Sequence, residues 1–446
     1  MASETGAAAP PGASADRGSQ SEVGGWTLSS TYTLGFLIVI YALNLADRNI
    51  FGLLMPLIKA DMQLSDTMLG LMSGFAFALF YALAGVPVAY LADRWNRRTI
   101  ITIGFAIWSM MTVLMGMVQN AVQLALTRFM LGAGEAACLA PSNSIIGDLF
   151  NKAHRTLALS ILQGSNSLSI LVAFPIFGWV AQHHGWRIAF ILAGAPGLVL
   201  ALLFFLTVKE PKRGQTDAAG PEPAPQVEKA APFLATMGRL VRTRSYVLAI
   251  LATTLTGISV MGVQTWLPTL LMRVHDLPPQ EVGAYVGFIR GPAGVAGAIF
   301  GGLLTTWLAR RDSRWLVWTP ALFMACVFVS DMIMLYVDSS VAWKIGMAAD
   351  TFFGSGQVGP IFGILLASAD ARSRATATAV AMLLLHIVGF TIGPLAIGVL
   401  NDILGPTLGP EAIRTSITIV AFSAIAGAIC CFSIGRLESP AAPART

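Results

Sequence analysis

A short charged segment, Ala89-Tyr-Leu-Ala-Asp-Arg-Trp-Asn-Arg-Arg98, separates the apolar runs at 67–91 and 99–118. A weaker copy, Gly302-Leu-Leu-Thr-Thr-Trp-Leu-Ala-Arg-Arg311, follows the apolar run at 281–308. A loop that recurs at the corresponding place in both halves of a chain is typical of duplicated bundles of membrane-spanning helices. The two copies therefore predict an internal repeat.

The composition places this repeat in a membrane. Of the 446 residues, 55% are hydrophobic and only 11% are charged, and the mean hydropathy is +0.70, whereas soluble domains are about 25% charged. The net charge of +5 lies mostly in short breaks between apolar runs, so it does not indicate nucleic-acid binding. The four cysteines lie in apolar runs without disulfide or metal-ligand spacing. We expect no metal and no cofactor.

Counting the apolar runs predicts the number of spans. A bilayer core needs roughly 20 apolar residues per helix, and twelve runs meet this length. They lie at 33–58, 67–91, 99–118, 121–148, 156–180, 187–208, 246–270, 281–308, 315–337, 341–368, 373–400 and 411–436. We therefore expect an all-α integral membrane protein with twelve transmembrane helices in two pseudo-symmetric six-helix bundles.

The longest polar break separates the two halves. It runs from Lys209 to Arg244, with a Pro/Glu/Ala-rich middle and a basic end. The Ala-, Gly-, Ser- and Pro-rich N-terminus has no basic start followed by an apolar core, so it does not resemble a cleaved signal peptide. The expected parts are a disordered cytoplasmic tail (1–30), the first bundle (31–208), a cytoplasmic linker (209–245), the second bundle (246–436) and a cytoplasmic tail (437–446).

The basic residues predict the orientation. With the N-terminus inside, twenty Lys and Arg residues lie on the inner side and five on the outer side, and short cytoplasmic loops retain such residues. Adding or removing one span would move every later loop to the opposite side of the membrane and remove this difference in Lys and Arg content. We expect a multi-pass protein of the cell (inner) membrane with both termini in the cytoplasm.

Ionisable residues inside the spans are the main functional signal. Charges at the bilayer centre are costly, so they usually face a polar interior and act there. Eight such residues are present: Asp47, Arg48, Arg128, Glu135, Arg290, Asp331, Asp350 and His386.

The spacing of four of these residues predicts how they meet. Arg128 and Glu135 are seven residues apart, which puts them on one helix face about 10 Å apart, so each needs a partner from another helix. Asp47 and Arg48 are adjacent and point about 100° apart around their helix. We expect one of them to meet Glu135 and the other to face the transport cavity.

A buried acid near a movable counter-charge can exchange a proton. Burial favours the neutral acid, while a nearby arginine favours the anion. Asp47 and Glu135 are therefore candidate proton-coupling acids, and Arg48 and Arg128 are candidate counter-charges. The alternative is a static ion-pair lattice that holds the bundle together.

Arg290 is a candidate substrate ligand. It lies in Gly287-Phe-Ile-Arg-Gly-Pro292, where glycine and proline loosen the helix, and its guanidinium could bind a phosphate or carboxylate headgroup. The alternative is a charge paired with an acid that the sequence does not identify. Asp331 and Asp350 are expected to be structural.

The loop signature resembles that of the major facilitator superfamily, Gly-x-Leu-Ala-Asp-Arg-x-Gly-Arg-Arg, with Ala89 and Asn96 in place of the two glycines. The resemblance implies a cytoplasmic gating latch. Its members would be Asp93, Arg94, Arg97 and Arg98, with the carboxylate near neighbouring helix ends and the guanidinium groups bonding the last carbonyls. The alternative is a set of charges that only fixes topology.

Within that superfamily the chain is similar to the Spinster-like transporters. The matching motifs are Asn44-Leu-Ala-Asp-Arg48, Arg128-Phe-Met-Leu-Gly-Ala-Gly-Glu135, Trp266-Leu-Pro268 and His386-Ile-Val-Gly389. Phe390 departs from the pattern, because family members often carry an aspartate there. The resemblance implies a lysophospholipid or sphingoid-type substrate, and it gives His386 a headgroup or proton role.

These patterns predict a secondary active transporter that works by alternating access and is coupled to protons. The main alternative is a proton-coupled symporter of a soluble organic anion such as a sugar acid. A receptor that has lost transport is disfavoured by the retained acids, and no nucleophile, ATP-binding or zinc motif supports an enzyme or a pump. The expected partners are a small amphipathic or anionic substrate, protons and membrane lipids, and we expect a monomer.

Overall fold

The computed structural model describes residues 25–214, 216, 233–367 and 374–437, and these residues are helical almost throughout and contain no strand. The first half contains α1 (Leu28–Met62), α2 (Asp66–Ser73), α3 (Phe75–Ala92), α4 (Arg97–Met115), α5 (Ala121–Glu135), α6 (Leu139–Leu149) and α7 (Lys152–Thr207). The second half contains α8 (Phe233–Arg242), α9 (Arg244–Val274), α10 (Pro279–Tyr285), η1 (Val286–Arg290), α11 (Gly291–Ala309), α12 (Trp315–Tyr336), α13 (Ala342–Gly356), α14 (Val358–Ala367), α15 (Arg374–Leu384), η2 (Leu385–Gly389), α16 (Phe390–Leu408), η3 (Gly409–Glu411) and α17 (Ala412–Leu437).

Where residues are described, the expected spans lie on helices. Some helices contain two expected spans, however, and some expected spans contain two helices. Within the described part of the chain, eight helices are long and apolar enough to cross a membrane, and two of these, Ala153–Thr207 and Val380–Leu437, are long enough to cross twice. The first of them turns at Gly185, whose φ of 80° favours glycine.

Three expected spans are interrupted. Within 67–91 α2 ends at Ser73 before α3 begins, within 121–148 α5 ends at Glu135 before α6 begins, and within 341–368 α13 ends at Gly356 before α14 begins. The pieces of the last two are too short to be recognised singly as spans. Counted as two crossings, and added to six single and two double crossings, they give twelve.

Asparagine residues mark the starts of three helices in the first half. Asn96, Asn120 and Asn151 each accept a hydrogen bond from a backbone N–H three residues later, at 2.9, 2.9 and 3.2 Å. Asparagine is among the preferred N-cap residues because its side chain satisfies an N–H that has no partner within the helix. Asn96, which replaces a glycine of the loop signature, therefore has a structural task at the start of α4.

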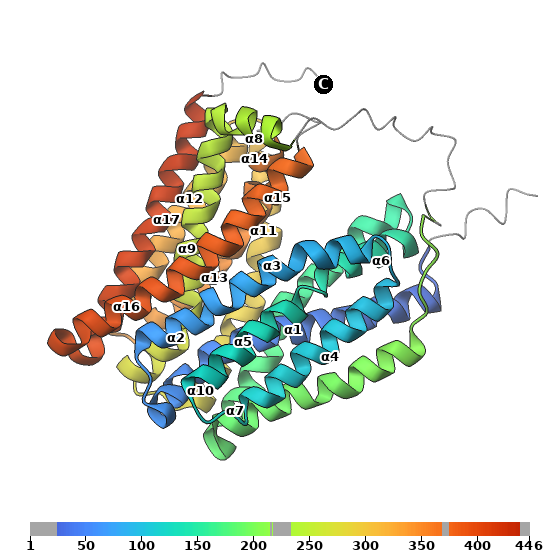
Figure 1. Ribbon diagram of the computed structural model, residues 1–446. Coiled ribbons are helices and arrows are strands. Elements are labelled where there is room, and N and C mark those ends of the chain that lie inside the picture. The colour runs from blue at the N-terminus through green and yellow to red at the C-terminus, as the bar shows by residue number, and fades with distance from the viewer. Residues whose placement is uncertain (1–24, 215, 217–232, 368–373, 438–446) are drawn as a thin grey trace, which may run out of the picture.

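The helices form two groups. Figure 1 shows α1–α7 against α8–α17, close together where α2, α10 and α16 lie and diverging toward α6 in one group and α8 in the other. We call the first region the contact end, where α1 ends and α2 begins, and the other the motif end, where Asp93–Arg98 and Arg310–Arg311 lie. The bundles approach closely at two places: a Cβ at Gly398 of α16 would lie 2.3 Å from the carbonyl oxygen of Asp66 of α2, and a Cβ at Gly283 of α10 would lie 2.3 Å from that of Phe174 of α7.

Parts of the expected tails and linker lie outside the described residues, namely 1–24, 215, 217–232 and 438–446. Within the expected linker, Phe233–Arg242 forms the helix α8, which was not predicted. It packs against α9 and α15. Leu240 is buried, whereas Arg239 and Arg242 are exposed, so α8 is amphipathic.

Candidate transport site

Arg48 and Glu135 form the central ion pair of the first bundle. The Nε of Arg48 on α1 donates to a carboxylate oxygen of Glu135 on α5 at 2.6 Å. The guanidinium also lies over the rings of Phe77 and Tyr81, 4.6 and 4.8 Å from their centroids. Glu135 is 1% exposed, and its other carboxylate oxygen is buried without a partner among the described residues. The expectation that Asp47 or Arg48 meets Glu135 is confirmed for Arg48.

Asp47 does not face a transport cavity. It is buried inside the first bundle and accepts a hydrogen bond from the Thr112 hydroxyl of α4 at 3.1 Å. That half of the expectation is wrong, because the 100° between neighbouring side chains directs Asp47 toward Thr112 of α4 when Arg48 faces α5. Thr112, which the sequence analysis did not single out, is its recorded partner.

Arg128 is held by helix ends instead of by an acid. Its Nε and one Nη donate to the carbonyl oxygens of Met72 and Ser73, where α2 ends, at 3.3 and 3.5 Å. Carbonyls at a helix C-terminus carry partial negative charge, which stabilises a cation. The guanidinium lies 4.2 Å from the centroid of Phe51, and its second Nη is buried without a recorded partner.

An aromatic stack joins this cluster to the second bundle. The rings of Tyr81 and His386 lie 5.7 Å apart at an interplanar angle of 13°. The Nδ1 of His386 lies 2.8 Å from the carbonyl oxygen of Met382, which is the geometry of an Nδ1–H donor. Contacts therefore run from Glu135 through Arg48 and Tyr81 to His386. Acidic and aromatic groups of one bundle thus reach a titratable group of the other.

Arg290 is paired within the second bundle. Its Nε donates to the Thr351 hydroxyl at 2.7 Å, and one Nη lies 3.5 Å from a carboxylate oxygen of Asp350. Asp350 is thus the acid that the sequence did not identify. Asp331 on α12 is fully buried nearby, and neither of its oxygens has a partner among the described residues.

Both predicted substrate ligands lie in π-helical turns. Arg290 ends η1 and His386 lies in η2, in corresponding spans of the two halves of the second bundle. A π-helical turn inserts an extra residue into a helix and is frequent at functional sites. The sequence signal was the glycine and proline that follow each turn, at Gly291-Pro292 and Gly393-Pro394.

A second group of charges closes the contact end, and the sequence analysis did not predict it. Asp66 at the start of α2 is bonded by Arg273 at the end of α9 at 2.7 Å, and also by Lys59. Asp402 of α16 accepts hydrogen bonds from the backbone N–H groups of Asp66 and Thr67, at 3.0 and 2.7 Å. These bonds join the two bundles. Asp66 is the first residue of α2 and Asp402 lies within α16, and both are outside the apolar runs of the expected spans.

In the first loop copy, Arg97 is the organising residue. It is 1% exposed, and it donates to Glu210 at 2.7 Å, to Ser144 at 2.9 Å and to Asp148. Glu210 also accepts from the backbone N–H of Arg98 at 2.8 Å. This network fastens the segment after α7 to the ends of α4 and α6, so it lies within the first bundle.

Arg98 is half-buried and donates to the carbonyl oxygen of Val208, just after α7, at 3.1 Å, whereas the other two members of the predicted latch lie at the surface. Asp93 is exposed, and its carboxylate has no recorded partner among the described residues, although its carbonyl accepts a bond from Arg213. Arg213 also donates to the carbonyl oxygens of Ala92 and Trp95, both at 2.6 Å. Arg94 is exposed over the ring of Tyr90. Arg213 thus bonds the carbonyls at the end of α3, which is the role that the sequence analysis gave to the signature's own arginines.

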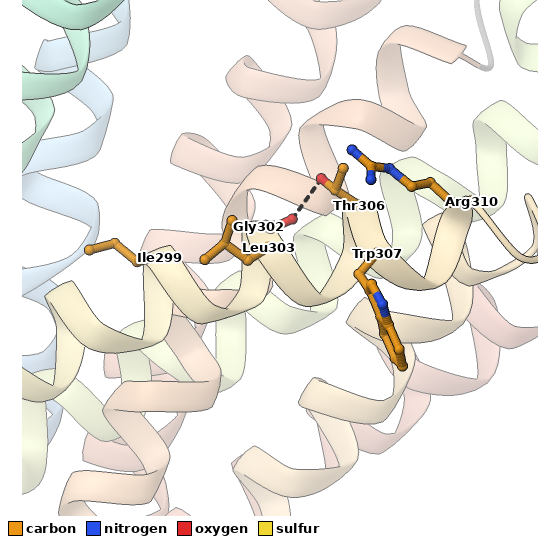
Figure 2. A pocket seen from close by; sticks show the side chains of 6 residues that line it. All are labelled: Ile299, Gly302, Leu303, Thr306, Trp307 and Arg310. Carbon is orange, nitrogen blue, oxygen red and sulfur yellow. Dashed lines mark hydrogen bonds between the residues drawn. The ribbon is translucent and has the colours of Figure 1, made fainter.

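The second loop copy makes no such network. Figure 2 shows a hollow beside α11 that Ile299, Gly302, Leu303, Thr306, Trp307 and Arg310 line. Thr306, which replaces the acid, donates to the carbonyl oxygen of Gly302 in its own helix at 2.8 Å (Figure 2). Arg310, at the position of Arg97, is exposed.

Two packed helical bundles, each with buried charges and joined by an aromatic stack and a terminal ion-pair group, define a multi-pass membrane transporter of the secondary type. The chain belongs to the Major Facilitator Superfamily, whose sequence model matches residues 37–394. Among the described residues, no group of three or more His, Cys, Asp or Glu side chains is placed to hold a metal ion.

Curated relatives differ in what they are said to transport. An MFS-type efflux pump of Mycolicibacterium smegmatis is 30% identical over 89% of this chain and 90% of its own length. The sphingosine-1-phosphate transporter SPNS2 of Xenopus tropicalis is 28% identical over 65% of this chain and 57% of its own. A probable galactarate/D-glucarate transporter of Bacillus subtilis is 24% identical over 72% and 74%.

Among solved structures, a bacterial homologue of the human lysosomal transporter Spinster, in an inward-facing and unoccupied conformation, is similar throughout. It is 26% identical, it matches 94% of this chain and 100% of its own, and the TM-score is 0.81. The resemblance to the Spinster-like transporters is therefore confirmed. The relatives and the fold are those of transporters, not of enzymes.

Proposed function

We propose that this protein is a proton-coupled transporter of an amphipathic anion of the lysophospholipid or sphingoid type. The observation that carries the proposal is the series of contacts from Glu135 through Arg48 and Tyr81 to His386, because it connects a buried acid to a residue of the other bundle.

The coupling step uses the acids of the first bundle. Glu135 bonds Arg48 through one oxygen only, and Asp47 bonds a hydroxyl, so each can accept a proton without losing more than one strong bond. Arg48 and Arg128 balance the two acids when both are ionised. Protonation of Glu135 releases Arg48, whose charge then favours an anion or a rearrangement of α1.

The substrate end of the site lies in the second bundle. Arg290 and His386 offer donors to a phosphate or carboxylate, each from a π-helical turn. Arg290 would then exchange Asp350 for the headgroup. The similarity to a sphingosine-1-phosphate transporter and to the Spinster homologue supports a lipid anion.

A soluble dicarboxylic sugar acid is the second candidate. It is favoured by the galactarate/D-glucarate transporter, whose similarity covers more of its own length than that of the sphingosine-1-phosphate transporter. Both candidates present an anion to the same donors. They differ in whether an apolar chain accompanies it.

The deciding experiment is uptake into proteoliposomes under an imposed pH gradient, with a lysophospholipid, sphingosine-1-phosphate and glucarate compared. Glu135→Gln should abolish gradient-driven accumulation and leave exchange measurable, because the neutral amide binds no proton. Glu281→Gln, at an exposed acid of α10, is the matched control. Accumulation by Glu135→Gln at the rate of the native protein would contradict the coupling role, and uptake of glucarate alone would select the second candidate.

We further propose that the protein lies in the inner membrane as a monomer with its motif end in the cytoplasm, and that the exposed Asp93 latches that end when the bundles close there. An impermeant thiol reagent applied to intact cells should label Asp276→Cys, at the contact end, and leave Lys212→Cys unlabelled. Both positions are exposed. The reverse pattern would invert the orientation.

A further inference from the structure

The second bundle contains a buried site of two acids and one base, and one of its acids, Asp331, has no part in the proposed transport cycle. Asp331 of α12 is fully buried, Asp350 of α13 is 4% exposed and Arg290 of η1 is 5% exposed. Arg290 lies 3.5 Å from a carboxylate oxygen of Asp350 and donates to Thr351 at 2.7 Å. Both oxygens of Asp331 are buried and have no hydrogen-bond partner among the described residues.

The charges of this site do not balance. The helices of Asp331 and Asp350 pack together, and a Cβ at Gly346, one turn before Asp350, would lie 2.8 Å from the carbonyl oxygen of Ser330. Two neighbouring carboxylates therefore share the one guanidinium of Arg290. With both acids ionised the site carries one net negative charge, and no donor among the described residues bonds Asp331. Removing such a carboxylate from water costs several kcal/mol, and buried acids usually become neutral instead.

We propose that the Arg290–Asp331–Asp350 site binds one proton, which Asp331 carries in this conformation. Asp331 gains the proton from water and becomes a neutral acid, while Asp350 remains ionised beside Arg290. Two acids that share one guanidinium exchange their proton, so the proton belongs to the site as a whole and moves to Asp350 if Arg290 turns toward Asp331. This proposal is independent of the coupling role of Glu135, and it shares Arg290 with the proposed substrate site.

The position of Arg290 connects the site to the interface between the bundles. Arg290 ends the π-helical turn η1, and η1 packs against α7 of the first bundle, where a Cβ at Gly287 would lie 2.6 Å from Pro175. A shift of α7 relative to η1 would therefore move the guanidinium that decides which acid holds the proton.

Infrared spectroscopy tests the proposal directly, because a protonated carboxyl group has a C=O stretching band that a carboxylate lacks. The protein is purified in detergent as Asp47→Asn/Glu135→Gln, so that the acids of the first bundle do not contribute. We expect a carboxylic-acid band at neutral pH that shifts in heavy water. The band should disappear in Asp331→Asn.

Asp350→Asn is the second variant. With Asp350 neutral, Arg290 should ionise Asp331, so the band should disappear here as well, and this variant decides the test if Asp331→Asn does not fold. Retention of the band in either variant would overturn the proposal. So would its absence from the parent protein together with higher thermal stability in sodium than in choline chloride, which would show a bound cation in place of the proton.

Discussion

The two bundles balance their buried charges in different ways. In the first bundle Asp47 and Glu135 are matched by two arginines, whereas in the second Asp331 and Asp350 share Arg290. Protonating an acid makes the first cluster positive, but it makes the second cluster neutral. The two clusters therefore differ in what a proton does to their net charge. The protonated first cluster is positive and attracts an anion, whereas the protonated second cluster is neutral and costs less to bury.

The two copies of the charged loop also differ between the bundles, in how far their arginines are buried and paired. Arg97 of the first copy is buried among acids, whereas Arg310 of the second copy is exposed and Thr306 bonds its own helix. The first bundle thus carries a fixed network at the motif end. Among the described residues, the second loop copy makes no such network.

The largest effect should come from breaking the network of the first copy. Arg97→Ala removes a buried guanidinium and leaves Asp148 and Glu210 without it, which should destabilise the protein by about 3 to 5 kcal/mol. Arg310→Ala, at the matching position, should change stability by less than about 0.5 kcal/mol because the side chain is exposed. Thermal unfolding in detergent measures both. Equal losses would refute the asymmetry of the two copies.

The next effect separates the charge clusters. Asp331→Asn and Asp350→Asn should each be mild, since Arg290 keeps one acid, whereas the double variant leaves a buried guanidinium without any. We expect the double variant to lose about 2 to 3 kcal/mol more than the sum of the single variants. The three proteins and their parent form a double-mutant cycle measured by chemical denaturation. Additive losses would show that the acids do not substitute for each other.

The sequence predicted much of this comparison, for a physical reason. Twenty apolar residues in a row have few alternatives to a spanning helix, so the spans, the repeat and the intramembrane charges could all be found by counting. Which charge meets which depends on the rotation and depth of helices far apart in the chain. The pair of Arg48 with Glu135 was one of two arrangements considered, and the pair of Arg290 with Asp350 was left open.

The sequence also could not predict what lies outside the apolar runs. Asp66 and Arg273 lie at the ends of two helices and Asp402 lies within a third, and nothing in their local sequence brings them together. The breaks after Glu135 and Gly356 were missed because the composition continues to be apolar and small across them. Helix ends are determined there by packing between helices, which periodicity does not report.

A smaller effect concerns the ion pairs of the contact end. Arg273 bonds Asp66 across the bundles, whereas Lys59 bonds the same acid from within the first bundle. Arg273→Ala should therefore shift the balance away from this conformation by roughly ten-fold, about 1.4 kcal/mol after allowance for partial exposure. Lys59→Ala should leave the balance unchanged.

Distances between spin labels at Trp95→Cys and Trp307→Cys, one on each loop copy, report that balance. The label distance should shorten in Arg273→Ala as the motif end closes. A similar shortening in Lys59→Ala would mean that the total positive charge around Asp66 controls the balance, and that the bond between the bundles does not.

The smallest effect should come from the aromatic stack between the bundles. Tyr81 lies against His386 on one side and near the guanidinium of Arg48 on the other, 4.8 Å from its ring. Tyr81→Phe keeps the ring and so should preserve both contacts. Tyr81→Leu keeps apolar volume but removes the π-face, which should cost about 0.5 to 1.5 kcal/mol. If the stack transmits the state of Glu135 to His386, Tyr81→Leu should also flatten the dependence of anion binding on pH, measured by fluorescence titration. Loss of affinity with the pH dependence intact would reduce Tyr81 to a packing residue.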